Sequence, residues 1–224
     1  MNQEIKELRR KLVSYPDMIR EETEGLSFEQ MAFADREQGW ARWSIDLHIR
    51  HMAQIPCTWL CVEESENLRA AGYSFPPSTE ALVKNRLSGS RLVSPEIAPH
   101  RQALLELLKE WSDFCCLIVD QEGPEGLRRI EIHRYVDPEE QRPGDPKKPI
   151  EYTRLDAQLH PTGYTEDPNQ PGHFIIELGT ALGHFYWNML AHLRNIQRIK
   201  SLMGIHPALE LPREGYLKFS EFYD

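Results

Sequence analysis

The chain has 224 residues, 27% of them charged, and a formal net charge of −9 at pH 7. This length is enough to bury a core without disulfides, so we expect a single domain over residues 1–224. The acidic balance argues against nucleic acid or anionic lipid as a partner, and no apolar run is long enough to span a bilayer. Because the first residues are charged and show no secretory signal, we expect a cytoplasmic protein.

The N-terminal segment predicts a long helix followed by a short one. Apolar residues recur at helical spacing over residues 4–24. Pro16 lies inside this run and predicts a kink or a break. Ser27 and Gln30 have the spacing of a capping box, which predicts a short helical turn after Ser27.

A serine also opens the second long helix. Ser44 is a good N-cap residue, and Asp46 lies in the first turn, where the helix dipole favours an anion. We expect this helix to extend to about Ala71 and to end at Gly72. Pro56 lies within it and predicts a bend.

The third long helix follows a break and a short helix near residues 75–80. A serine, a proline and an acid at residues 94–96 form a helix start signal. We therefore expect the third helix over residues 95–121, where leucines and aromatic residues give a wide apolar stripe.

The next segment changes character. Residues 127–137 and 149–159 alternate in hydrophobicity like strands, and a loop rich in proline and charge separates them. We expect them to form a β-hairpin inserted over about residues 127–159.

The last long helix should follow a loop over residues 162–172. We expect it to begin near Gly172 and to end by Gly204. The tail, residues 205–224, should be mostly non-helical, with aromatic residues that pack onto the body. Four amphipathic helices most simply form a bundle, so the predicted fold is all-α with a small β insertion.

The four cysteines lie in apolar, helix-like stretches, and no two have the spacing of a zinc knuckle. We expect them to be buried, reduced thiols that behave as small hydrophobic residues. They are Cys57, Cys61, Cys115 and Cys116.

The last helix carries a row of polar residues at four-residue spacing, His184, Asn188 and His192. Side chains four apart lie one above the other on a helix, and two such imidazoles can bind one metal. A third ligand from another helix would complete the site, and His51 lies toward the core side of the second helix. A core histidine bonded to a neighbour is the alternative interpretation of His51.

Two sequence segments resemble the motifs of the DinB/YfiT-like family. In WSIDLHIRHM, Trp43, Ser44 and His51 match the Trp-Ser signature and the histidine eight residues after the tryptophan. In HFYWNMLAHLRNIQRI, His192 matches the second of two ligand histidines. The resemblance extends over the order of the helices, although the hairpin insertion has no counterpart in it.

The resemblance implies a four-helix bundle with a mirror variant of the up-and-down topology. It also implies a histidine triad that binds zinc or nickel, frequent homodimerisation, and activities such as thiol transfer or hydrolysis. The chain departs from the family at Asn188, which occupies the position of the first ligand histidine on the last helix.

Three accounts of the site stay open. The metal is held by His51, Asn188 and His192; or His184 or His48 replaces the lost imidazole; or the site has lost its metal. The resemblance therefore implies either a metal-dependent transferase or hydrolase acting on a small molecule, or a metal-free protein of the same fold that binds a ligand or partner. An obligate helical dimer with its function elsewhere is a third hypothesis.

Overall fold

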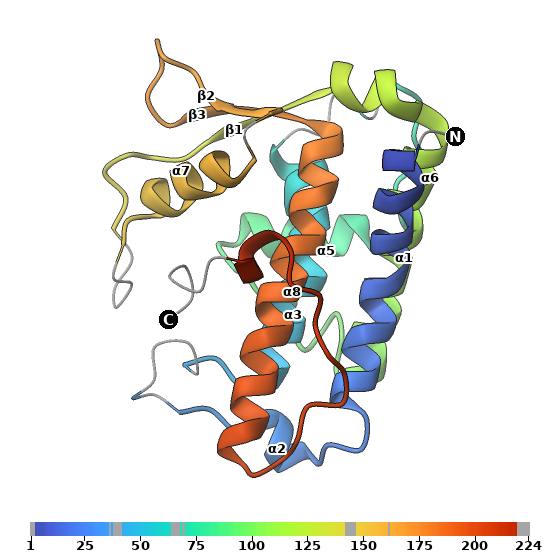
Figure 1. Ribbon diagram of the computed structural model, residues 1–224, viewed down its shortest axis with the longest axis vertical. Helices are drawn as coiled ribbons and strands as arrows, with labels where there is room; N and C mark the ends of the chain where they lie inside the picture. The colour runs from blue at the N-terminus through green and yellow to red at the C-terminus, as the bar shows by residue number, and fades with distance from the viewer. Residues whose placement is uncertain are drawn as a thin grey trace.

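Four long helices form a bundle, and a small sheet lies at one end of it (Figure 1). The computed structural model describes residues 3–35, 37, 42–63, 68, 70–141, 147–160 and 162–218. The long helices are α1 (Gln3–Thr23), α3 (Ile45–Cys57), α6 (Arg101–Arg129) and α8 (Leu178–Leu202). Within the described residues, no helix is long and apolar enough to cross a membrane.

The four long helices do not simply alternate in direction. In Figure 1, α1 and α8 run downward, whereas α3 and α6 run upward. Arg101 at the start of α6 donates to the Thr23 carbonyl at the end of α1 (2.7 Å), so this pair is antiparallel. The helices α1 and α3 each pack against both α6 and α8. The parallel course of α3 and α6 requires a long connection, which contains α5 (Thr79–Leu87).

The first helical boundaries follow the local signals in the sequence. The helix α1 runs without interruption through Pro16. The short helix α2 (Phe28–Ala32) opens with the predicted capping box, because the Ser27 side chain accepts from the Gln30 N–H and the Gln30 side chain accepts from the Ser27 N–H. This prediction is confirmed.

The predicted cap of the second long helix is also confirmed. The Ser44 hydroxyl accepts from the Leu47 N–H (3.3 Å) and fixes the first turn of α3. After Pro56 the hydrogen-bonding pattern changes from α to π, in the turn η2 (Thr58–Glu63). Proline and single π-turns are both common causes of bends in helices. The bend expected at Pro56 therefore corresponds to this change in helix type.

The predicted start of the third helix is wrong. The segment that begins at Pro95 makes only a single turn. Pro99 disfavours the helical conformation for the residue before it, so the turn cannot continue into a helix. The helix α6 begins instead after His100, whose side chain accepts from the Ala103 N–H (3.2 Å). Near its other end, Gly123 has a positive φ of 63° and divides the helix in two.

The second strand of the predicted hairpin is also wrong, because residues 149–159 form a helix, α7 (Pro149–Leu159). A proline at the first helical position suits a helix start. The Glu151 side chain accepts from the Lys148 N–H (2.7 Å). Ile150 and Thr153, three residues apart, are buried on the same face of the helix. The alternating hydrophobicity of residues 149–159 therefore suggested a strand, although the segment also has the buried face of a helix.

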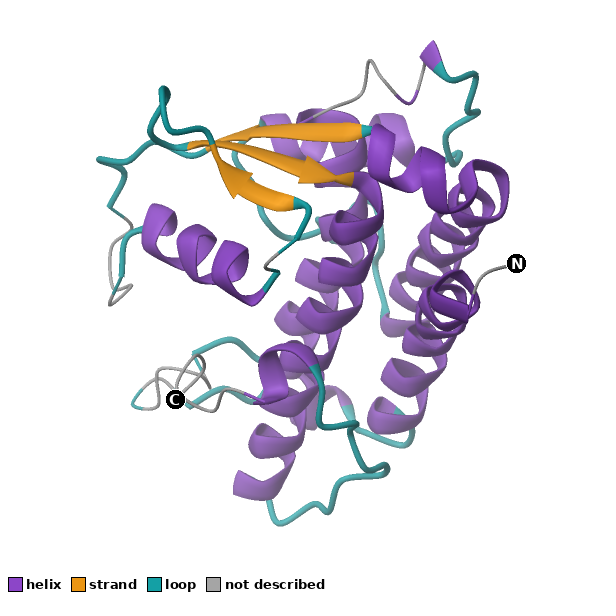
Figure 2. Cartoon of the chain, turned by 45° about the horizontal axis from the view of Figure 1, so that its top comes forward, coloured by secondary structure: helices purple, strands orange, loops and turns teal. Residues whose placement is uncertain are grey.

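The sheet has three antiparallel strands in the order β1–β3–β2. They are β1 (Glu131–Tyr135), β2 (Tyr164–Glu166) and β3 (His173–Glu177). His133 of β1 lies opposite Ile175 of β3, and Thr165 of β2 lies opposite the same Ile175 on the other side. Figure 2 shows the sheet and α7 together beside the end of the bundle.

The β3 strand occupies residues that were expected to begin the last helix. The predicted start near Gly172 is wrong, and α8 begins at Leu178. The predicted loop over 162–172 contains β2. Phe174 and Ile176 are buried on one face of β3, so this segment has the alternation of a strand with one covered face. The apolar character of the segment did not distinguish a strand from a helix.

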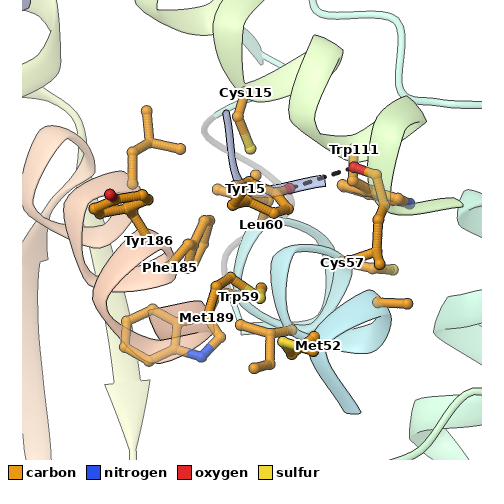
Figure 3. Packing of buried hydrophobic residues seen from close by; sticks show 14 of the residues in the cluster. Tyr15, Met52, Cys57, Trp59, Leu60, Trp111, Cys115, Phe185, Tyr186 and Met189 are labelled. Atoms are coloured by element: carbon orange, nitrogen blue, oxygen red, sulfur yellow. Dashed lines mark hydrogen bonds between the residues drawn. The ribbon is translucent and has the colours of Figure 1, made fainter. Parts of the chain in front are cut away.

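A continuous apolar core joins the bundle to the sheet. At its centre Tyr15 is fully buried and its hydroxyl donates to the Leu108 carbonyl (3.4 Å). Figure 3 shows aromatic and sulfur-containing side chains of the four helices packed around it. All four cysteines are buried and free, as expected: Cys57, Cys61, Cys115 and Cys116.

Residues 205–218, which we call the C-terminal strap, pass over α8 after its end (Figure 1). The Gln197 side chain donates to the Leu209 carbonyl (2.9 Å). The strap ends in the short helix η3 (Gly215–Lys218), where Tyr216 is buried as predicted. Three other aromatic residues of the tail lie outside the described residues: Phe219, Phe222 and Tyr223.

Candidate functional site

Three histidines meet where α3 packs against α8. His48 and His51 lie on α3, and His192 lies on α8. The ring centroids of His48 and His51 are 5.1 and 4.9 Å from that of His192. We call these three residues the histidine cluster. The structure thus brings together the predicted ligands His51 and His192, and it adds His48, which the sequence offered as a substitute.

An aromatic side chain borders the histidine cluster. The ring of Trp43 lies 4.9 Å from that of His51 and stacks at 6.1 Å on that of His192. The guanidinium carbon of Arg91 lies 5.6 Å from the centroid of the Trp43 ring. Trp43 directly precedes Ser44, the N-cap of α3.

Hydrogen bonds assign roles to the ring nitrogens. The His51 Nδ1 lies 3.0 Å from the Arg91 carbonyl oxygen. Because a carbonyl only accepts, Nδ1 carries the proton, and in the neutral ring Nε2 holds the lone pair. The Nδ1 atoms of His48 and His192 are 2.8 Å apart, so one of them donates and the other accepts.

The surroundings of His192 favour the neutral form of its imidazole. Burial lowers the pKa of His192 well below its ordinary range, and the neighbouring His51, His48 and Arg91 lower this pKa further. A neutral imidazole retains the lone pair that a metal or a hydrogen-bond donor requires. His192 is therefore kept in the form that can act as a ligand at neutral pH.

Asn188 lies one turn before His192 on α8. Its amide oxygen Oδ1 is buried and has no hydrogen-bond partner among the described residues. A buried amide oxygen without a partner is uncommon in native proteins. Asn188 is therefore a polar group close to the histidine cluster whose partner the described chain does not supply.

His184 belongs to a second group of side chains. Its Nδ1 is hydrogen-bonded to the hydroxyl of Tyr216 from the strap, and its ring stacks on Trp59 at 4.6 Å. Burial lowers its pKa well below its ordinary range. Slightly more than two helical turns separate His184 from His192, about 12 Å along the axis. The structure therefore does not bring this proposed substitute into the histidine cluster.

The surroundings of His184 contain further titratable groups. Burial lowers the pKa of His160 to about 4. Burial raises the pKa of Asp156 to about 7, although the charge of Arg134 and a hydrogen bond from Tyr216 oppose this shift. His160, His184 and Tyr216 are buried. This second group joins α7, α8 and the strap through polar contacts.

The donor set of the histidine cluster fits zinc or nickel in chemistry. Neutral imidazole suits both ions, and an Nδ1–H that donates to a carbonyl is the usual outer contact of a ligating histidine. The 2.8 Å between the His48 and His192 nitrogens is shorter than the roughly 3.3 Å between two donors on a tetrahedral zinc. In the described part of the chain, no three His, Cys, Asp or Glu side chains are already arranged to hold a metal. Metal binding would therefore require the hydrogen bond between His48 and His192 to break, so that their nitrogens could bind the ion instead.

Comparison with family models, curated proteins and solved structures gave no match to the chain.

Sequence reasoning did not single out Arg91, Asp156 or Tyr216 as partners of the histidines. Arg91 contacts His51 through its backbone carbonyl. Every residue has such a carbonyl, so the residue type at position 91 could not indicate this contact. The burial of Tyr216 was expected from its aromatic character, but its hydrogen bond to His184 depends on the path of the strap.

Proposed function

We propose that this chain is a DinB-like, metal-dependent transferase or hydrolase, in which the histidine cluster holds a zinc or nickel ion. The observation that carries the proposal is the mutual contact of three imidazoles from two facing helices. His48 takes the place of the imidazole that Asn188 removes from the family pattern. Bundles commonly place metal sites between facing helices in this way.

The residues around the cluster have defined roles in this proposal. The metal supplies Lewis acidity, which makes a water or a thiol nucleophilic at neutral pH. The Arg91 carbonyl orients His51, and Trp43 limits the access of water to the rings. Asn188 offers its amide to a small-molecule substrate. The resemblance further suggests a homodimer. Sedimentation at low protein concentration tests this assembly, and a stable monomer would contradict it.

Metal content tests the proposal directly. Protein purified without chelator is expected to contain about one zinc or nickel ion per chain, and His51→Ala should reduce this to background, because two imidazoles remain. Elemental analysis measures the metal. His206→Ala, which changes an exposed histidine of the strap, is the control and should keep the metal. Metal-free wild-type protein of normal stability would contradict the proposal.

The second candidate is a metal-free protein of the same fold that binds a ligand or partner. The hydrogen bond between His48 and His192 favours it, because that bond satisfies both nitrogens without a metal. In this case wild-type protein contains no metal, and Asn188→His should create zinc binding by restoring the family triad. Arg194→His, at an exposed position of the same helix, is the control and should bind no zinc. Failure of Asn188→His to bind zinc would contradict the proposed alignment with the family.

A further inference from the structure

Arg50 is a charged side chain that the fold buries beside the histidine cluster. It is 7% exposed. Its Nε donates to an Asp46 carboxylate oxygen (2.6 Å), and its Nη1 donates to the carbonyls of Val93 (3.1 Å) and Ala98 (3.0 Å). A buried guanidinium is tolerated only when it is paired and hydrogen-bonded. These bonds meet that condition and fasten the segment after α5 to α3.

Other polar side chains fix the same segment. The Asn85 amide donates to the Leu92 carbonyl (2.8 Å) and to the Gln54 side chain (2.9 Å). The Val93 N–H donates to the Arg50 carbonyl (3.2 Å). The backbone on the C-terminal side of Arg91 is therefore held by side chains of α3 and α5.

This fastened segment presents the Arg91 carbonyl to the His51 Nδ1–H. In metal sites, the acceptor on the second ring nitrogen sets the tautomer and the orientation of a ligating histidine. We propose that Arg50 is a positioning residue: through the Val93 and Ala98 carbonyls it holds the segment that fixes His51 in the Nδ1–H tautomer. The consequence for metal affinity rests on the proposed function, whereas the consequence for the tautomer does not.

The tautomer of His51 tests this role in the metal-free protein. We expect long-range ¹H–¹⁵N NMR spectra to show His51 as Nδ1–H in the wild type, with its signals assigned by their loss in His51→Gln. In Arg50→Met, His51 should change to a mixture of tautomers, because the segment that carries the Arg91 carbonyl loses its bonds from the guanidinium to Val93 and Ala98. Titration with zinc alone should show a 10- to 100-fold weaker affinity, the usual effect of losing an outer contact.

Two further variants separate positioning from general stability. Arg101→Met removes another bond from an arginine to a backbone carbonyl, at the Thr23 end of α1, and should leave the His51 tautomer and zinc affinity unchanged. Arg50→Lys keeps a buried cation but replaces the guanidinium fork with a single nitrogen, and it should reproduce the tautomer change if Arg50→Met does not fold.

The outcomes distinguish this inference from the proposed function. An unchanged His51 tautomer in folded Arg50→Met, or in Arg50→Lys where the methionine variant does not fold, would overturn the positioning role. Wild-type protein that binds no zinc would refute the proposed function, while the tautomer comparison would still decide the role of Arg50.

Discussion

Replacing Lys200 with methionine is expected to destabilise the fold by about 3–5 kcal/mol. Lys200 and Glu22 form a buried ion pair, with side chains 4% and 0% exposed. The Glu22 carboxylate also accepts from the Gln197 amide (2.8 Å) and from the Ala208 N–H of the strap (3.1 Å). Methionine keeps the apolar stem but leaves the carboxylate buried without its cation. Urea unfolding measures the loss.

An exposed pair provides the control for this prediction. Lys109 and Asp113 lie four residues apart on α6 with side chains 57% and 59% exposed. Lys109→Met should change stability by no more than about 0.5 kcal/mol, because solvent screens such pairs. The double change of Glu22→Gln with Lys200→Met should recover most of the loss, since no unpaired charge stays buried. A loss below about 1 kcal/mol in Lys200→Met would show that Glu22 is not held as the structure describes.

The parts of the fold that were predictable from sequence are those fixed by neighbouring residues. The caps at Ser27 and Ser44 depend on bonds within one turn, so their spacing in the sequence was sufficient. The start signal at Pro95 failed although it is equally local, because Pro99 ends the turn that it begins. A local signal is therefore reliable only when no competing residue follows within a turn.

The β insertion could not be predicted in detail because its pairing is non-local. The strand β3 pairs with β1 on one side and with β2 on the other, and residues 136–163 separate β1 from β2. The helix α7 lies within that separation. Nothing in the alternation of residues 149–159 reveals that the strand partner of β1 comes later in the chain.

The candidate site was predictable in part. The motifs identified His51 and His192, and both lie in the histidine cluster. The choice between His48 and His184 as a third imidazole required the crossing of α3 and α8, which only the packing defines. His184 faces the end of the bundle near the sheet, where Trp59 and Tyr216 contact it. The sequence indicates that all these histidines lie on helices. It does not indicate how the helices are rotated about their axes, and this rotation decides which histidines face one another.

Acid is expected to destabilise the protein, because buried histidines take up protons when it unfolds. His160 has a pKa of about 4 in the fold because it is buried, whereas an unfolded histidine has a pKa of about 6.5. The unfolded state therefore binds more protons than the fold below pH 6.5, so stability is complete above this pH and falls as the pH drops toward 4. His184, with its lowered pKa, acts in the same direction. Asp156, with its pKa raised to about 7, acts in the opposite direction, because its proton stays bound in the fold.

Three buried histidines, His160, His184 and His192, have lowered pKa values and only Asp156 opposes them among these groups, so the net effect of acid is a loss of stability. Between pH 7.5 and 4.5, His160 alone should remove about 2–3 kcal/mol from the free energy of unfolding. Urea unfolding at both pH values measures the change. His160→Phe keeps the ring stacked on Trp187, which lies 4.3 Å away, and should reduce the acid-induced loss by about that amount. His206→Phe, at an exposed position, should not. If the stability of wild type and of His160→Phe depended on pH in the same way, the prediction would be contradicted. His160 would then be protonated in the folded protein, in its buried position, as readily as in the unfolded chain.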